Sequence, residues 1–234
     1  MDNVQRFLDA FAMIEKCLKQ ITGMTRYTGF FQLLNQASKR NALVRKAQLE
    51  LQEYAELRNA IVHQRSGDGN ILAIPVEEVV EDIERLAKQL SDPERVGTHF
   101  QKPVRICHPD TDIHVAFDIM NKMETSKVPV YAQGGFHSLL TMEMIARWMM
   151  NQCKHQQPIA GQVSDCLVYR SKQERVRFLP KDATVSEAQE LFEDALHKGI
   201  SLSAILITES GQTHQKPIGI ITVSDLPLLY SIQQ

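Results

Sequence analysis

A short run of residues near the C-terminus has the groups that bind a phosphate ester. Gly219–Ile221 predicts a buried strand that delivers Thr222 to the start of a helix. The first backbone N–H groups of a helix are unpaired and carry partial positive charge, so they favour an anion such as phosphate. The hydroxyls of Thr222 and Ser224 can add hydrogen bonds, and Asp225 can accept from the two hydroxyls of a ribose. The alternative is that Asp225 only caps the helix and Thr222 only ends the strand.

A second set of reactive residue types, Arg58, Asn59 and His63, stands at the end of a predicted helix. Asn59 and His63 are four positions apart and therefore share one helical face. A histidine exchanges a proton near neutral pH and can take one from a ribose 2′-hydroxyl, while an arginine neutralises charge that develops on phosphate. These groups suit metal-independent cleavage of RNA. The alternative is that Asn59 and His63 cap the last helical carbonyls, with Arg58 solvated or paired with Glu53 or Glu56.

The elements that carry the second set are predicted to be helices throughout residues 1–92. Apolar residues recur at spacings of three and four, which is the pattern of a helix with one buried face. The predicted helices run from Val4 to Gly23, from Thr28 to Ala37, from Asn41 to His63 and from Pro75 to Leu90, with a turn at Ser66–Asn70. Four helices with short connections predict an up-and-down bundle.

Beyond Pro93 short β-branched runs alternate with amphipathic stretches. The expected strands are Val104–Cys107, Val128–Tyr131, Arg175–Leu179, Ala204–Ile207 and Pro217–Val223. Alternating strands and helices indicate an α/β unit. The chain is therefore expected to be an α+β protein of two domains, 1–92 and 97–234.

The C-terminal domain also repeats itself. Val104–Cys107 aligns with Val176–Leu179, and further on Leu139–Thr141 aligns with Ile220–Thr222. A two-copy repeat, about 97–155 and 160–232, indicates two similar modules that bury a common face against each other.

These residues resemble a pair of CBS domains over roughly residues 97 to 232. His108–Ile113, with Ala116 and then Val128–Val130, resembles the first half of a CBS repeat, and Pro180–Val185 opens the second copy in the same way. Gly219–Leu226 resembles the Gly-apolar-apolar-Thr-x-x-Asp signature of the family.

The resemblance implies a regulatory ligand and no required cofactor. The ligand would be an adenine nucleotide, AMP, ADP or ATP, bound in the cleft between the paired repeats. The adenine edge would be read by backbone near Ser203 and Ala204.

The first copy departs from the signature. It keeps Thr141 but has Ser138 in place of the glycine and Met144 in place of the aspartate. Glu143 is one position early and would point about 100° away on a helix. We therefore expect one nucleotide per chain, bound at the second copy.

Residues 1–92 resemble HEPN domains, helical bundles that include metal-independent ribonucleases. The resemblance lies in Arg58-Asn59 followed four positions later by His63, and in the order of the helices. It implies a homodimer in which two such sites face each other, and RNA as a candidate partner.

Net charge, cysteine spacing and the length of apolar stretches exclude several other classes of protein. The net charge of −2 gives no broad basic field of the kind that sequence-independent nucleic-acid binders use. The 4 cysteines include no Cys-x-x-Cys pair, and with the histidines they show no zinc spacing, so neither a metal site nor a disulfide framework is expected. A signal pattern and an apolar stretch of about 20 residues are both missing, so a soluble, cytoplasmic protein without a membrane span is expected.

Three functions remain open. The first is a sensor that couples an adenine nucleotide to a helical dimerisation or effector domain. The second is a nucleotide-gated ribonuclease acting at Arg58, Asn59 and His63, so whether the chain is an enzyme is undecided. The third is a structural dimer with a vestigial ligand site.

Overall fold

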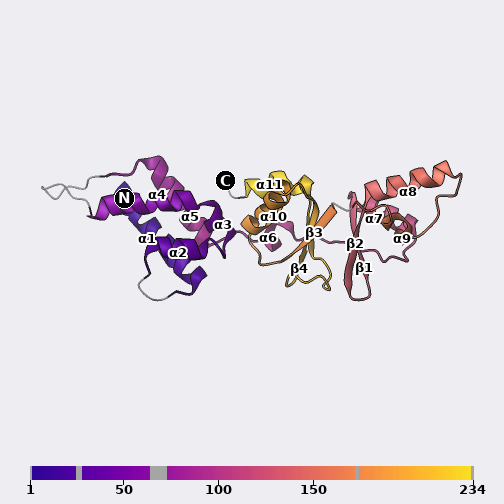
Figure 1. Ribbon diagram of the computed structural model, residues 1–234, viewed down its shortest axis with the longest axis horizontal. Helices are drawn as coiled ribbons and strands as arrows, with labels where there is room; N and C mark the ends of the chain where they lie inside the picture. Colours follow the sequence, from indigo (N-terminus) through magenta and orange to yellow (C-terminus); the bar gives the residue numbers. More distant parts are fainter. Residues whose placement is uncertain (1, 25–27, 64–72, 172–173, 233–234) are drawn as a thin grey trace. The chain divides into compact units, whose positions relative to one another are not determined.

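The computed structural model describes residues 2–24, 28–63, 73–171 and 174–232 (Figure 1). The chain folds into two compact units, one of residues 1–94 with 184–190 and the other of residues 95–183 with 191–232. It combines helix and sheet, as the sequence predicts. All of its strands within the described ranges follow residue 126.

The first unit is built on a long amphipathic helix, α1. Its helices are α1 (Asn3–Thr22), α2 (Phe30–Ala37), α3 (Ala42–Lys46), α4 (Gln48–His63) and α5 (Glu77–Ser91). Asp2 caps the start of α1 by accepting from the Val4 N–H, and Gly23 ends the helix in the left-handed conformation at φ 69°. The buried face of α1 packs against α2, α4 and α5, with Phe7, Ile14 and Leu18 fully buried.

The predicted helix from Asn41 to His63 is two helices. Asn41 caps α3 by accepting from the Val44 N–H at 2.9 Å, and Ala47 then leaves the helical conformation with ψ 13° before α4 begins. Ala47 is buried, so the apolar spacing continues through the break. The sequence pattern therefore does not indicate that the helix is interrupted here. The predicted turn at Ser66–Asn70 lies outside the described residues.

The first copy, in the second unit, contains a hairpin. After α6 (Val96–Phe100) and α7 (Ile113–Lys122), strands β1 (Lys127–Ala132) and β2 (Gly135–Thr141) pair antiparallel, with Val128 opposite Leu140. Helices α8 (Met142–Lys154) and α9 (Val163–Leu167) pack against β2, and α7 packs against β1. Trp148 and Met144 on α8 are almost fully buried in the resulting core.

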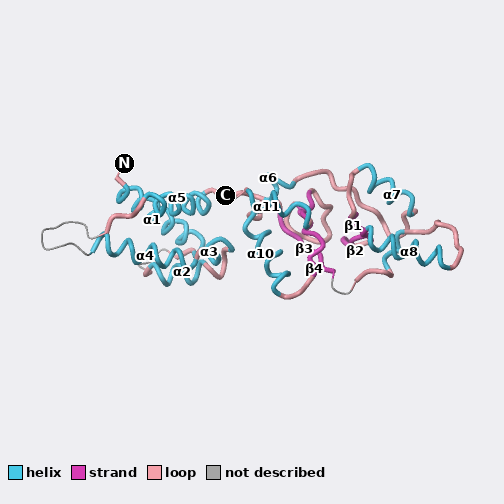
Figure 2. Tube along the Cα trace, turned by 90° about the horizontal axis from the view of Figure 1, so that it is seen from above, coloured by secondary structure: helices cyan, strands magenta, loops and turns pink. Residues whose placement is uncertain are grey.

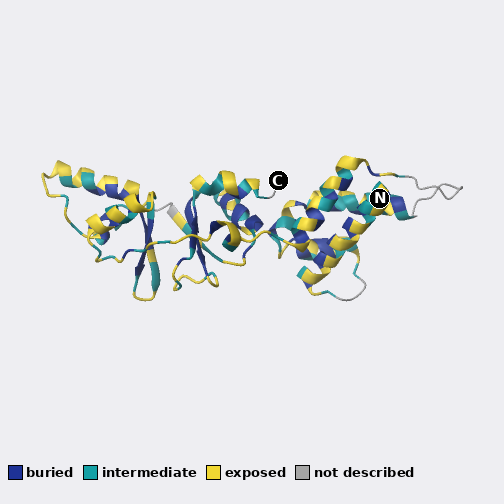
Figure 3. Cartoon of the chain, turned by 180° about the vertical axis from the view of Figure 1, so that it is seen from behind, coloured by how far each residue is buried: buried dark blue, intermediate teal, exposed yellow. Residues whose placement is uncertain are grey.

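The second copy forms a three-stranded sheet in the order β3-β4-β5. Strand β3 (Glu174–Pro180) runs parallel to β4 (Ser201–Thr208), which follows α10 (Val185–His197), and β5 (Gly219–Ile221) pairs antiparallel to β4. Every β4 residue after Ser201 is buried, as expected of a central strand, and the strand is dark blue in Figure 3. Figure 2 shows α10 and the last helix, α11 (Leu226–Ser231), beside β3 and β4.

Two expected strands are corrected. Val104–Cys107 is not a strand, because only Cys107 forms an isolated parallel bridge, to Val130. Pro217–Val223 shortens to the three residues of β5, because Pro217 cannot donate to a ladder and a 3-10 turn, η1 (Val223–Asp225), begins after Thr222. Strand β2 as a whole was not predicted, since its first half, Gly135–His137, has no continuous apolar pattern.

The two copies meet through an apolar layer within the second unit. Leu139 of β2 packs with Leu206 of β4 and Ile220 of β5, and the rings of Phe136 and Phe178 meet edge to face at 5.2 Å. The hairpin tip also contacts the loop before β5, where Phe136 N–H donates to the Thr213 carbonyl at 2.8 Å.

Tyr131 adds a second link between the hairpin and that loop. Its hydroxyl donates to the Gln215 carbonyl at 2.9 Å, and burial raises the pKa of the phenol to about 12. The tyrosine is therefore neutral and able to donate this bond over the whole physiological pH range.

The cysteines are free thiols. Cys17, Cys107 and Cys166 are buried, and burial raises the pKa of each, to about 12 for Cys166. Among the described residues no helix is both long and apolar enough to cross a bilayer.

Candidate functional site

The start of β5 needs a glycine because another segment runs against it. A Cβ atom at Gly219 would lie 2.4 Å from the carbonyl oxygen of Phe100, which is closer than any real side chain allows. The backbone of β5 therefore lies directly against the backbone of Phe100. The strand is followed by Thr222, which stands at the start of η1 and α11.

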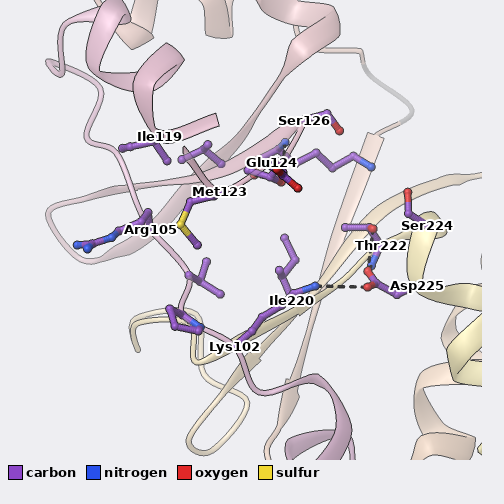
Figure 4. A pocket seen from close by; sticks show the side chains of 15 residues that line it. Lys102, Arg105, Ile119, Met123, Glu124, Ser126, Ile220, Thr222, Ser224 and Asp225 are labelled. Atoms are coloured by element: carbon purple, nitrogen blue, oxygen red, sulfur yellow. Dashed lines mark hydrogen bonds and ion pairs between the residues drawn. The ribbon is translucent and has the colours of Figure 1, made fainter. Parts of the chain in front are cut away.

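Asp225 closes this turn and is held in one orientation. Its Oδ2 accepts from the Thr222 backbone N–H at 2.7 Å and from the Thr222 hydroxyl at 2.9 Å. Its other oxygen, Oδ1, lies 3.3 Å from the Nζ of Lys102, as the dashed line in Figure 4 shows. Asp225 is thus a capping residue, and it also presents a fixed, partly exposed anion to whatever lies beside Lys102.

A pocket of about 250 Å³ lies in front of this turn (Figure 4). Thr222, Ser224 and Asp225 form one side of it, and Ser126 and Lys127 of the first copy also line it. Residues of both copies therefore contribute to a single concave site within the second unit. Its volume is just below the range of about 300–1,000 Å³ for small-molecule sites, which favours a small ligand.

The lining of this pocket combines three kinds of surface. It has an apolar part, hydroxyl groups and charged groups of both signs. The apolar residues are Pro103, Val104, Ile119, Met123, Val128 and Ile220; the hydroxyls are on Thr125, Ser126, Thr222 and Ser224; the cations are Lys102, Arg105 and Lys127; and the acids are Glu124 and Asp225. Such a lining can hold a flat apolar group, a polyhydroxyl group and a phosphate in one ligand.

The structure brings together three of the five predicted binding residues. Thr222, Ser224 and Asp225 line the same pocket, whereas Ser203 lines a different pocket and Ala204 is fully buried in the apolar layer between the copies. Their backbone belongs to β4, which pairs with β5 through Ile205 and Ile221, and neither residue lines the Asp225 pocket.

Strand pairing shows which residues of the first copy correspond to Ser203 and Ala204. Val128 pairs with Leu140 in the first copy as Ile205 pairs with Ile221 in the second. Two positions earlier, Ser126 is thus the counterpart of Ser203. The pocket beside Asp225 is lined by Ser126 and Lys127, so the first copy contributes this segment to the site that the second copy's helix start forms.

The sequence reasoning missed Lys102, Arg105, Ser126 and Lys127. Lys102 and Arg105 flank Pro103-Val104, near the start of the first copy, and two basic residues at that point were the available signal. No sequence signal indicated Ser126 and Lys127, because their position beside Asp225 depends on how the two copies pack.

The first copy has no acid equivalent to Asp225. Met144 stands there and is 2% exposed, within the core formed with Trp148. Thr141 keeps the capping role, since its hydroxyl oxygen accepts from the Met144 N–H at 3.3 Å. The pocket that Ser203 lines therefore lacks a ribose-binding carboxylate at this position.

In the first unit Arg58 and Asn59 are adjacent on α4. The Arg58 Nη1 donates to the Asn59 Oδ1 at 3.3 Å, and both residues line a pocket of about 280 Å³ with Phe11, Phe30 and Phe31. The side chain of His63 lies outside the described residues, so the predicted trio is placed only in part. No group of three or more potential metal ligands occurs in the described part of the chain.

Comparison with known protein families identifies the C-terminal segment. The family model described as "CBS domain" matches residues 96–151 and 172–226, one match for each copy. No curated protein sequence is similar enough to count as a match.

Several solved structures are similar to this chain. A CBS domain-containing protein of unknown function from Kribbella flavida is 15% identical, with a TM-score of 0.43 over 59% of this chain and 99% of its own. An acetoin utilization protein, AcuB, from Vibrio cholerae is 12% identical, with a TM-score of 0.40 over 59% of this chain and 90% of its own. The protein CBSX2, solved in complex with AMP, is 12% identical, with a TM-score of 0.40 over 60% of this chain and 99% of its own.

Proposed function

We propose that this protein, whose C-terminal part is a tandem CBS domain pair, is a regulatory protein that binds an adenine nucleotide, AMP, ADP or ATP, in the pocket beside Asp225. One observation carries the proposal. The Asp225 carboxylate is fixed by Thr222 and has a second oxygen directed to a pocket that also contains cations and an apolar surface.

Each part of the pocket has a role in this proposal. Asp225 Oδ1 accepts a ribose hydroxyl, and Lys102, which now lies 3.3 Å from it, turns to a phosphate. Thr222 keeps Asp225 in place, Ser224 donates to the same phosphate, and the apolar side formed by Val104, Val128 and Ile220 receives the adenine. The predicted role of Ser203 and Ala204 passes to the equivalent segment, Ser126-Lys127.

The regulatory role follows from the two-copy construction of the pocket. A ligand that contacts Asp225 of the second copy and Ser126 of the first binds tightly only when the copies are correctly placed. Its binding therefore favours one arrangement of the pair over others, which is the requirement for passing a signal on.

The test is a comparison of AMP with 2′-deoxy-AMP by isothermal titration calorimetry. Wild-type protein is expected to bind AMP about tenfold more tightly, because a hydrogen bond to a charged group is worth about 1.5–3 kcal/mol. Asp225→Asn keeps an oxygen that can accept from Thr222, so the turn is retained, but it should weaken AMP binding and remove the preference for the 2′-hydroxyl.

Asp118→Asn, which removes an exposed carboxylate on α7 outside the pocket, is the matched control and should behave as wild type. Equal affinity of wild-type protein and Asp225→Asn for AMP would refute the proposed site. Mass spectrometry of the supernatant from denatured protein would identify a copurified nucleotide.

A second candidate function is ribonuclease activity of the helical unit, gated by the nucleotide. The observation that favours it is the pocket at Arg58 and Asn59, whose Phe30 and Phe31 rings can stack on bases. Labelled RNA incubated with a chelator should be cleaved by wild-type protein, and not by Arg58→Ala or His63→Ala. RNA that stays intact with wild-type protein at every nucleotide concentration would exclude catalysis.

The HEPN-like domain and the homodimer belong to the same proposal. Sedimentation of the full chain with and without AMP would measure the dimer directly. A dimer that neither binds nucleotide nor cleaves RNA would instead favour a purely structural role.

A further inference from the structure

The lysine beside Asp225 is held at its backbone by the second copy. Gln101 forms an isolated antiparallel bridge with Gly219, and the Lys102 N–H donates to the Ile218 carbonyl at 3.1 Å. The Lys102 side chain is nevertheless 47% exposed, and it lines the Asp225 pocket. Its main chain is therefore fixed, while its long, flexible side chain can exchange one partner in the pocket for another.

The ammonium group of Lys102 lies at the oxygen of Asp225 that a ligand needs. Asp225 Oδ2 accepts from the Thr222 N–H at 2.7 Å and from the Thr222 hydroxyl at 2.9 Å, and two bonds use the acceptor capacity of one oxygen. A ligand must therefore bond to Oδ1, and the Lys102 Nζ lies 3.3 Å from that atom (Figure 4). A ribose that binds to Asp225 competes with Lys102 for this oxygen.

The charge of the ligand decides this competition. A ligand with a phosphate gives Lys102 a new anionic partner when the ribose takes its place at Oδ1. A nucleoside offers no anion, so it would displace Lys102 from Asp225 without compensation. Because the ion pair is partly exposed, the cost of breaking it is modest, and the bond between Lys102 and phosphate makes the larger contribution to discrimination.

We infer that Lys102 makes binding in the Asp225 pocket depend on a phosphate group, because its ammonium group occupies the ribose acceptor until a phosphate binds it. The ligands are thereby restricted to nucleosides that carry a phosphate, and the same nucleosides without one are rejected. This inference rests on the proposed function, since it concerns the same pocket, and it makes Lys102 a specificity-determining residue.

The test is equilibrium dialysis of the full chain with radiolabelled AMP and radiolabelled adenosine. Wild-type protein should prefer AMP by about tenfold or more. Lys102→Met keeps the length of the side chain without its charge, so it should weaken AMP binding about tenfold and strengthen adenosine binding about two- to fivefold. The opposite signs identify competition, because a lysine that only contacts phosphate would leave adenosine binding unchanged.

Two matched variants separate this role from a general effect of charge. Lys102→Arg keeps the positive charge and should keep the preference for AMP. Lys198→Met removes a lysine that pairs with Asp194 at 2.8 Å on α10, outside the pocket, and should bind both ligands like wild type. Lys102→Gln is the second neutral variant if Lys102→Met does not fold.

The inference is overturned if Lys102→Met leaves adenosine binding unchanged, or if it changes the affinities for AMP and adenosine by the same factor. Equal affinity of wild-type protein for AMP and adenosine would also overturn it. In each of these cases AMP still binds, so the proposed function stands. Wild-type protein that binds no AMP, or Asp225→Asn that binds AMP like wild type, would instead remove the proposed function and this inference with it.

Discussion

At the scale of single residues, the polar groups of the candidate site have structural as well as chemical roles. Asp225 holds the turn after β5 through Thr222, and the same carboxylate faces Lys102. Capping and ligand binding are therefore compatible, since they use different oxygens of one side chain. The alternative reading of Asp225 as a cap is correct in itself and does not exclude a binding role.

The close approach at Gly219 makes a stability prediction. Gly219→Ala should destabilise the protein by about 1–3 kcal/mol, because its Cβ would meet the Phe100 carbonyl oxygen and the backbone would have to move. Urea unfolding followed by circular dichroism measures the change.

The control for Gly219→Ala is the equivalent position in the first copy. Ser138 already carries a Cβ there, so Ser138→Ala should stay within about 0.5 kcal/mol of wild type. Equal stability of the two alanine variants would show that the tight backbone contact does not constrain β5.

Thr222, Ser224 and Asp225 could be predicted because they are contiguous and their spacing is a local property. Lys102, Ser126 and Lys127 come from a different copy, and nothing local places them beside Asp225. The predicted reading of adenine by backbone near Ser203 and Ala204 stays a prediction, and Ser203 lines the other pocket. Strand residues of one copy line the pocket that the other copy's helix start forms.

At the scale of elements, the two copies end corresponding helices with different residues. After α7, Glu124 adopts φ 47° and the Thr125 N–H donates to the Met120 carbonyl; after α10, Gly199 adopts φ 63° and the Ile200 N–H donates to the Ala195 carbonyl. Both are the same helix-ending motif, and the left-handed position favours glycine.

This pair predicts opposite effects of two substitutions. Glu124→Gly should stabilise the protein by up to about 1 kcal/mol by removing an unfavourable backbone conformation, and Gly199→Ala should destabilise it by about 1–2 kcal/mol by introducing one. Thermal unfolding of the two variants side by side checks both signs. A loss of stability in Glu124→Gly would mean that the Glu124 side chain contributes more than its backbone conformation costs.

Helices α1 and α5 are joined by ion pairs that predict a pH dependence. Arg6 donates to Glu84 at 2.9 Å and 2.7 Å and to Glu77 at 2.5 Å, and these hydrogen bonds lower the pKa of both carboxyls in the folded protein. Groups with a lowered pKa contribute stability above their unfolded value, near 4.3, and that stability is lost as the pH falls through the folded value.

Arg6→Gln should therefore lower the unfolding midpoint at pH 7 and flatten its fall between about pH 5 and pH 3. Thermal melts across this range measure the slope. Arg85→Gln, which removes an ion pair within α5 alone, is the control for charge. The same slope in Arg6→Gln and wild type would show that these ion pairs do not contribute to acid unfolding.

The predicted elements with clear apolar periodicity are present, and the differences occur where periodicity carries no information. The break at Ala47 lies on a continuous apolar face, and Val104–Cys107 has a strand-like composition but pairs only at Cys107. Strand β2 begins with Gly135, Phe136 and His137. These residues are in a strand because the hairpin pairs them with β1, and their own sequence has no strand pattern.

At the scale of the whole molecule, the sequence indicates the two-copy repeat. The structure shows the apolar layer and the pockets that the two copies form together. The apolar layer of Leu139, Leu206 and Ile220 lies between the copies, and each pocket takes lining residues from it. A sequence alignment of the copies cannot show this, because it pairs equivalent residues and not residues in contact.

The layer between the copies predicts a large effect of cavity formation. Leu139→Ala, at a residue 4% exposed, should destabilise the protein by about 2–5 kcal/mol. Leu196→Ala, at a residue 79% exposed on α10, should change stability by no more than about 0.5 kcal/mol. Denaturant unfolding gives both values, and similar values would contradict a packed layer between the copies.

The shared construction of the two pockets makes the copies interdependent. Because each pocket combines Val104 or Val176 of one copy with Leu139 or Ile220 of the other, a substitution in either copy alters a pocket that this copy does not form alone. A single copy expressed by itself would therefore contain only one side of each pocket.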